Sequence, residues 1–187
     1  NQGVRTGEII MAKTLISTHT ASADSSIDIT SGITSAYKSY EFHFVNLHPA
    51  NDGVGLRFQV NAAGESGFNE SMMSTMFVAT LNEDGSSGAV AYNAADQAMG
   101  TDYPLLNFNT GNDDDQSCSG VLTLFGPSST TYVKHYTYTG VTSAEDDKVH
   151  NHFIAGYINV AAAIDEISFK FSGGNIDAGV IKMFGVG

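Results

Sequence analysis

The chain has few of the residues that stabilise small secreted domains or bind polyanions. Its single cysteine, Cys118, cannot form a disulfide within the chain, and we expect it to be a small buried hydrophobic side chain. Only eight lysines and arginines stand against 20 acidic residues, and they do not cluster. At a net charge of −12, this pattern argues against binding to nucleic acid or to anionic membranes.

Long apolar runs, tryptophan and charged residues are also scarce. No stretch approaches the roughly 20 apolar residues of a membrane-spanning helix, so we expect no membrane insertion. Charged residues make up 15% of the chain, against about 25% in typical domains. We therefore expect the polar surfaces to consist mainly of serine, threonine, asparagine and glycine. This composition suits an extracellular-type or particle-surface protein.

Period-2 alternation of apolar and polar residues dominates what is present. Tyr40, Phe42 and Phe44 fall on one face of a strand, while Glu41 and His43 fall on the other. Similar segments recur at 27–29, 56–60, 77–81, 121–125, 132–138, 167–171 and 180–184. Turn-forming residues separate them at 49–53, 82–88, 126–129 and 172–179. The pattern predicts an all-β, antiparallel, jelly-roll-like β-sandwich with a few short helical turns.

The hydrophobic content of 42% in a chain of 187 residues supports one folded core. We expect residues 13–187 to form one β-sandwich domain and residues 1–12 to form an extended N-terminal arm. The strand at 121–125 is apolar at both alternating positions, so we expect it to be central and covered on both faces. The helical turns are expected at 70–76 and 94–99. The core is expected to include four of the methionines, Met72, Met73, Met76 and Met99.

Two clusters contain weak candidates for metal ligands. His150 and His152 lie on the same side of a predicted strand, shortly after Asp146 and Asp147. A third ligand at a fixed spacing is missing, which favours a polar pair at a surface or a subunit interface. The acidic run Asp113, Asp114 and Asp115 could supply oxygen ligands to Ca²⁺, but the EF-hand pattern is not met and a solvated loop between strands is the favoured interpretation. The sequence predicts no catalytic residue, no cofactor site and no established metal site.

Tyrosines form a third candidate feature. Tyr132, Tyr136 and Tyr138 share one face of a predicted strand. They could pack across strands within the sandwich, form a subunit interface or contact a ligand such as a sugar. The absence of tryptophan weakens a lectin-like interpretation.

Residues 12–186 resemble a group of β-rich virion structural proteins of marine tailed phages. The similarity includes the turn Gly126-Pro127-Ser128-Ser129 and the turn Ser172-Gly173-Gly174-Asn175. The other similar segments are 12–17, 29–33, 37–53, 111–117, 120–125, 130–131, 156–157, 164–171 and 176–177, and residues 62–110 match least.

The resemblance implies a non-enzymatic virion protein, either a capsid decoration protein or a tail or fibre component. Such a protein assembles in the host cytoplasm, is exposed on the particle and contacts the capsid shell or tail. We expect a homo-oligomer, with a trimer favoured. Three alternatives stay open. One is a receptor-binding adhesin that recognises a host glycan, and another is an extracellular filament subunit that assembles through its arm. The third is a hydrolase with carboxylates in loops 82–88 and 112–116.

Overall fold

The computed structural model describes residues 13–187, which form eleven β-strands. Their bounds are β1 (Lys13–Thr20), β2 (Ile27–Ile29), β3 (Ser39–Pro49), β4 (Leu56–Ala62), β5 (Met72–Asn82), β6 (Gly88–Tyr92), β7 (Cys118–Phe125), β8 (Lys134–Ala144), β9 (Lys148–Ile158), β10 (Ile164–Phe171) and β11 (Ile176–Val186). These residues include no helix that could span a membrane.

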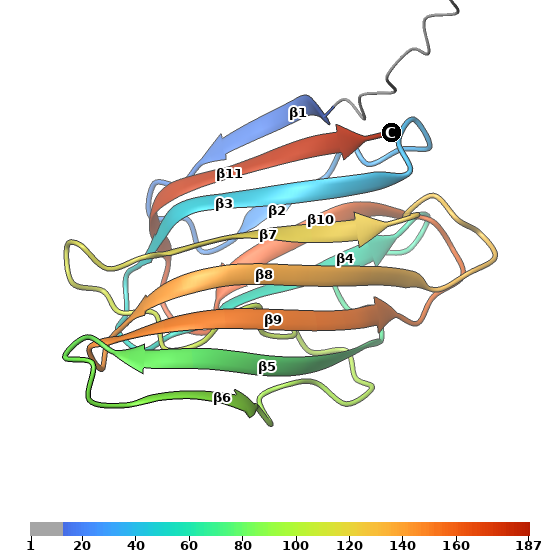
Figure 1. Ribbon diagram of the computed structural model, residues 1–187. Coiled ribbons are helices and arrows are strands. Elements are labelled where there is room, and N and C mark those ends of the chain that lie inside the picture. The colour runs from blue at the N-terminus through green and yellow to red at the C-terminus, as the bar shows by residue number, and fades with distance from the viewer. Residues whose placement is uncertain (1–12) are drawn as a thin grey trace, which may run out of the picture.

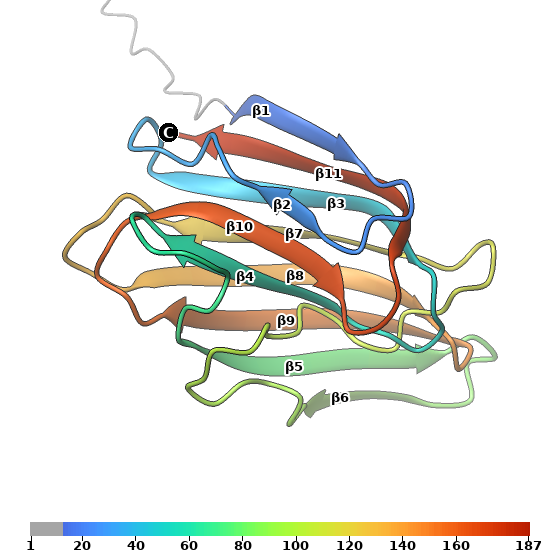
Figure 2. The ribbon, with the colours of Figure 1, turned by 180° about the vertical axis from the view of Figure 1, so that it is seen from behind.

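The strands form two antiparallel sheets of very unequal size. The larger sheet has eight strands in the order β1-β11-β3-β7-β8-β9-β5-β6 (Figure 1). The smaller sheet has three strands in the order β2-β10-β4 and packs across the middle of the larger one (Figure 2). This arrangement confirms the β-sandwich, while its jelly-roll form stays a prediction.

Alternation along the strands places aromatic side chains between the two sheets. Phe169 of β10 lies against Phe42 and Phe44 of β3, with ring centroids 5.5 and 5.1 Å apart. Phe58 of β4 meets Tyr136 of β8 edge-on at 4.9 Å. These five rings are at most 2% exposed, so they form the centre of the core, as the alternation at residues 40–44 predicts for that strand.

A loop segment widens the smaller layer beyond its three strands. Residues 104–110 run along the free edge of β4, where the N–H of Phe58 donates to Pro104 and the N–H of Leu106 donates to Leu56. Thr110 pairs with Val54 on one side and with Ala144 on the other. The segment therefore acts as a fourth, irregular strand, and it covers the inner face of β8 and β9 where β4 does not reach.

Three glycines on the inner face, Gly120, Gly140 and Gly156, make room for the buried tyrosines. Gly156 pairs with Tyr136 in the β8–β9 register, and a Cβ at Gly156 would lie 2.5 Å from the Tyr136 Oη. A Cβ at Gly120 would lie 2.7 Å from the Tyr138 Oη. Because real Cβ contacts are not that short, larger residues at these positions would displace a ring from the core.

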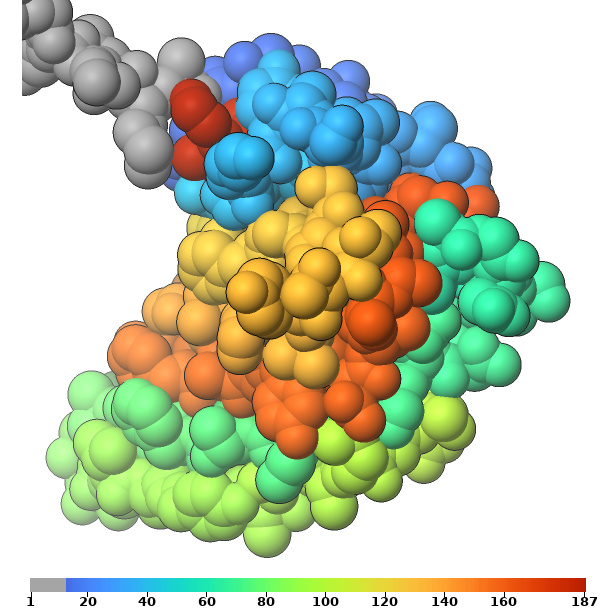
Figure 3. Space-filling view, turned by 90° about the vertical axis from the view of Figure 1, so that its right-hand side faces the viewer, coloured from blue at the N-terminus to red at the C-terminus, as the bar shows by residue number. Residues whose placement is uncertain are grey.

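Lys134 fixes the connection between the two sheets. It is fully buried at the start of β8, and its Nζ donates to the carbonyl oxygens of Val160 (3.0 Å), Ala161 (2.8 Å) and Ala162. These three residues belong to the connection from β9 to β10. Burial lowers the pKa of the Lys134 ammonium. Figure 3 shows the loop after β7 beside this connection. Ile164, the first residue of β10, donates to the Pro127 carbonyl in that loop.

Several expectations need correction. Residues 70–76 contain no helical turn, because 72–76 belong to strand β5. Residues 94–99 form no helix, because after a turn at 94–95 the segment runs along the edge of β5. Strand β7 is central, but its outer face is not covered, and Phe125 is 43% exposed. Met72 and Met76 are buried as expected, whereas Met73 and Met99 are exposed. Cys118 is buried as expected. The arm expected at 1–12 lies outside the described residues.

We expect Lys134→Met to lower the free energy of unfolding by about 2 kcal/mol, because three carbonyls of the inter-sheet connection lose a charged donor. Urea unfolding followed by circular dichroism measures this change. Lys38→Met, at an exposed lysine just before β3, is the matched control and should have little effect. An unchanged or higher stability of Lys134→Met would contradict the stabilising role.

Candidate functional site

The two histidines singled out from the sequence lie inside the sandwich. His150 is 4% exposed and His152 is fully buried, both on the inner face of β9. The centroids of their rings lie 5.8 Å apart. Phe108 belongs to residues 104–110, which we call the covering loop, and its ring centroid lies 5.1 Å from that of His150 and 4.8 Å from that of His152. The prediction that these histidines form a polar pair at a surface or a subunit interface is therefore wrong, since the loop segment covers both rings.

The buried histidines belong to a polar cluster with unused hydrogen-bonding capacity. Both ring nitrogens of His152 and the Nδ1 of His150 have no hydrogen-bond partner among the described residues. The same holds for the Tyr138 Oη, the Thr142 Oγ1 and the Asn107 Nδ2. Burial, with a smaller contribution from the neighbouring His150, lowers the pKa of His152 to about 3. The imidazole of His152 is therefore neutral in the folded protein near pH 7.

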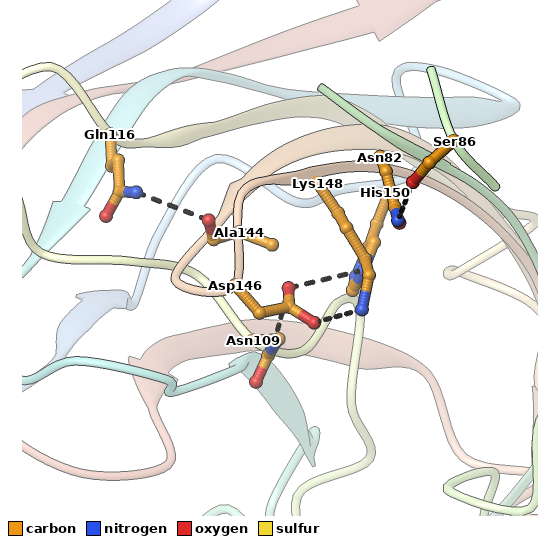
Figure 4. A network of polar contacts seen from close by, with 8 residues as sticks. All are labelled: Asn82, Ser86, Asn109, Gln116, Ala144, Asp146, Lys148 and His150. Atoms are coloured by element: carbon orange, nitrogen blue, oxygen red, sulfur yellow. Dashed lines mark hydrogen bonds and ion pairs between the residues drawn. The ribbon is translucent and has the colours of Figure 1, made fainter. Parts of the chain in front are cut away.

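One carboxylate lies near this cluster, in the turn between β8 and β9. Asp146 accepts hydrogen bonds from Lys148 (2.5 Å) and Asn109 (3.1 Å), and its other contact is the His150 Nε2 at 4.0 Å (Figure 4). The hydrogen bond from Lys148 lowers the pKa of Asp146 despite some burial. Burial also lowers the pKa of His150, although Asp146 opposes this shift. The contacts of Asp146 thus join the turn between β8 and β9 to the covering loop.

The acidic run lies elsewhere in the fold. Asp113, Asp114 and Asp115 are exposed in the loop before β7, which Gln116 ties to the β8–β9 hairpin by donating to the Ala144 carbonyl (Figure 4). Within residues 13–187, no group of three or more histidine, cysteine, aspartate or glutamate side chains is placed to hold a metal ion. The five candidate residues therefore do not converge on one site.

The three tyrosines predicted to share one strand face are divided between the core and the surface. Tyr136 and Tyr138 are each 1% exposed, whereas Tyr132 is 74% exposed in the loop before β8. Burial raises the pKa of both core hydroxyls. The cross-strand packing alternative is correct for Tyr136 and Tyr138, and an exposed groove made by these two residues is excluded.

A hollow of about 650 Å³ lies on the outer face of the smaller sheet. Arg57 of β4 and Lys170 of β10 line it from directly opposite positions, and neither forms an ion pair with a described residue. The Lys170 Nζ lies 3.9 Å from the centre of the Tyr103 ring, and Arg57 donates to the Tyr103 carbonyl. Asp102 also lines the hollow, so both signs of charge are present.

The larger sheet exposes a group of apolar side chains at its β6 end, on the face turned away from the smaller sheet. We call this group the apolar outer face; its residues are Met73, Phe77, Leu81, Val90, Tyr92, Val141, Val149 and Phe153. Phe77 and Phe153 stack face to face at 4.7 Å, yet Phe77 is still 47% exposed. Contiguous apolar side chains on a surface are typical of sites of protein–protein contact.

Sequence reasoning missed this surface, although a signal for it existed. Positions 73, 77 and 81 share the outer face of β5, and only one face of a strand in a two-layer sandwich can be buried. Because residues 72, 76 and 78 are also apolar, the sequence does not indicate which of the two faces is covered.

No protein-family model, curated protein or solved structure matches this chain.

The buried His152 predicts acid destabilisation. In the unfolded chain its pKa returns to about 6.5, so between pH 6.5 and about 3 the unfolded state binds more protons than the folded state. The free energy of unfolding therefore falls as the pH falls through this window, by at most about 1.4 kcal/mol per pH unit for this residue. Urea unfolding between pH 7.5 and 5 measures the slope before most carboxylates titrate.

His152→Leu should reduce that slope, because it removes the imidazole that resists protonation in the folded state. The substitution should cost little stability at pH 7.5, since both ring nitrogens lack partners. His135→Gln, at an exposed histidine of β8, is the control and should leave the slope unchanged. Equal slopes for wild type and His152→Leu would show that His152 does not cause the acid effect.

Proposed function

We propose that this chain is a non-enzymatic structural protein of a phage virion, a capsid decoration protein or a component of the tail or fibre. The resemblance of residues 12–186 to β-rich virion proteins suggests the class of particle. The apolar outer face carries the proposal that the protein works by self-assembly and surface contacts, because it offers a broad, rigid sheet surface with uncovered apolar side chains.

The position of this surface suits assembly. It lies on the side of the larger sheet away from the small sheet, so contacts there need no change in the core. Backbone pairing across neighbouring strands fixes the strands that carry these side chains, so association requires no ordering of the backbone there. The partners proposed are further copies of the chain and the capsid shell or tail, with the protein exposed on the particle.

A second candidate function is a phage adhesin that recognises a host glycan. The hollow lined by Arg57, Lys170 and Tyr103 favours it, because an aromatic ring with cationic and hydroxyl neighbours can contact an acidic sugar. Saturable binding of host envelope polysaccharide, lost in Tyr103→Ala, would support this candidate. We rank it second because Lys170 already occupies one face of the ring.

The test of the virion proposal is the composition of purified particles. Particles of a phage that encodes the chain should contain its peptides in mass spectrometry at a fixed copy number through density-gradient purification. If infected cells contain the chain while gradient-purified particles lack it, the virion proposal is wrong.

The pair of substitutions Phe77→Ser and Phe153→Ser should reduce incorporation into particles by tenfold or more, because it removes the stacked centre of the apolar outer face. Thr139→Ser, at an exposed position that pairs with Phe153 in the register, is the matched control. Circular dichroism verifies that both variants fold. Wild-type incorporation of the folded double variant would remove this surface from the assembly mechanism.

Deleting residues 1–12 tests the arm predicted from the sequence. The shortened chain, 13–187, should fold, because every strand of the two sheets lies within it. Its incorporation into particles should fall if the arm pairs with a neighbouring subunit. Equal incorporation of the two chains in a competition experiment would refute the arm.

A further inference from the structure

The two edges of the larger sheet are built differently. At one edge, β1 carries the exposed Lys13, which pairs with Glu41 at 2.5 Å, and a register shift between Leu15 and Ser17 interrupts its pairing with β11. A charge and a bulge are both features that discourage pairing with a further strand. At the other edge, all five residues of β6 are exposed, and none is charged or a proline. The pairing of β6 with β5 runs without a register shift.

The hydrogen bonds of the β5–β6 hairpin show which backbone groups point to the open edge. Asn82 donates to the Ser87 carbonyl, and Asn93 donates to the Met76 carbonyl. In an antiparallel pair, hydrogen-bonded and non-hydrogen-bonded positions alternate. The backbone groups of Ala89 and Ala91 therefore face β5. Those of Gly88, Val90 and Tyr92 point away from the sheet, each with one N–H and one C=O.

The sequence of β6 allows it to pair antiparallel with β6 of a second copy of the chain. In an antiparallel pair centred on Val90, Val90 lies opposite Val90 of the second copy, and Ala89 lies opposite Ala91. The one large residue, Tyr92, then lies opposite Gly88 of the second copy, which leaves room for the ring. Aromatic residues across from edge glycines are a favourable arrangement in β-sheets. A strand from an unrelated protein would not need this symmetry, so the pattern favours a second copy of the chain.

We propose that β6 of one copy pairs antiparallel with β6 of a second copy, about a two-fold axis through Val90, and joins two larger sheets into one continuous sheet. This inference rests on the self-assembly in the proposed function and names its surface and partner. Gly88, Val90 and Tyr92 each donate and accept one hydrogen bond across the axis. Val90 and Tyr92 share the face of Ala79 and Phe77, so the apolar outer faces of the two copies become contiguous.

The net negative charge of the chain affects the affinity of this dimer. Each copy has a net charge of −12, so two copies repel one another, and β6 brings together a segment without charge. Asp84 and Asp96 flank the strand at its two ends. Salt should therefore strengthen the dimer by screening the repulsion, whereas an interface held by ion pairs would weaken. The strand is short, so we expect a dissociation constant in the micromolar range or weaker.

The experiment is sedimentation velocity of the full chain over a concentration series, for wild type, Val90→Lys and Val90→Asp. Wild type should approach the mass of two 19.7 kDa chains, with a dissociation constant that falls as salt is raised. Each variant alone should dissociate at least tenfold more readily, because like charges then meet across the axis. An equimolar mixture of the two variants should recover the dimer, because a lysine then faces an aspartate.

Two further variants keep the result interpretable. Val90→Pro removes an N–H that points away from β5, so the hairpin should fold while the dimer is lost. Thr137→Lys places the same charge on the outer face of β8, away from the edge and outside the apolar outer face, and should leave the dimer intact. Circular dichroism verifies the fold of each variant.

Four outcomes would overturn the inference. They are a monomeric wild type at every concentration, a stable trimer that Val90→Lys leaves intact, an effect of Thr137→Lys as large as that of Val90→Lys, and a mixture that stays monomeric. The proposed function is judged separately from particle composition. A monomer in solution that is present in purified particles would refute only the β6 pairing, and a β6 dimer that is absent from particles would refute only the virion role.

Discussion

The contact between Phe169 of the smaller sheet and the aromatic rings of β3 is the interaction on which the rest of the fold depends. It places three strands across the middle of eight, and burial of these rings contributes apolar area that drives the two layers together. The two layers cannot match in width, because β2-β10-β4 is much narrower than the sheet it covers. Two features of the molecule follow from this mismatch.

One response is the covering loop. Residues 104–110 extend the smaller layer with backbone hydrogen bonds to β4, and Phe108 closes the interior over β9. An irregular segment fills space less evenly than a strand, and here the interior beneath it is polar. His150, His152, Thr142 and Asn107 share this space with unused donors and acceptors. The chain accepts buried polar groups at the point where its smaller layer ends, and the acid destabilisation predicted above originates in this region.

A second response is the exposed end of the larger sheet. Strand β6 extends beyond the smaller layer, so both of its faces and one edge meet solvent. The apolar outer face and the uncharged edge lie at this same end, while the charged and bulged edge lies at the other. The two ends of the larger sheet therefore differ. The β1 edge carries features that discourage pairing with a further strand, and the β6 edge lacks them. Such a distinction suits the self-assembly proposed above, because a protein with one open edge can bind a neighbour without forming open-ended aggregates.

The sequence by itself determined the strand periodicity, the antiparallel class and the inward direction of residues such as Tyr40, Phe42 and Phe44, because alternation is local and has a period of two. It could not decide which side of β5 is covered, since residues on both faces are apolar, nor that the helical turn expected at 70–76 is a strand. It also placed His150 and His152 on one face correctly but at the surface, because the ring that buries them, Phe108, comes from a loop some 40 residues earlier. Only the tertiary structure decided these points, since burial and edge position depend on which distant segments pack together.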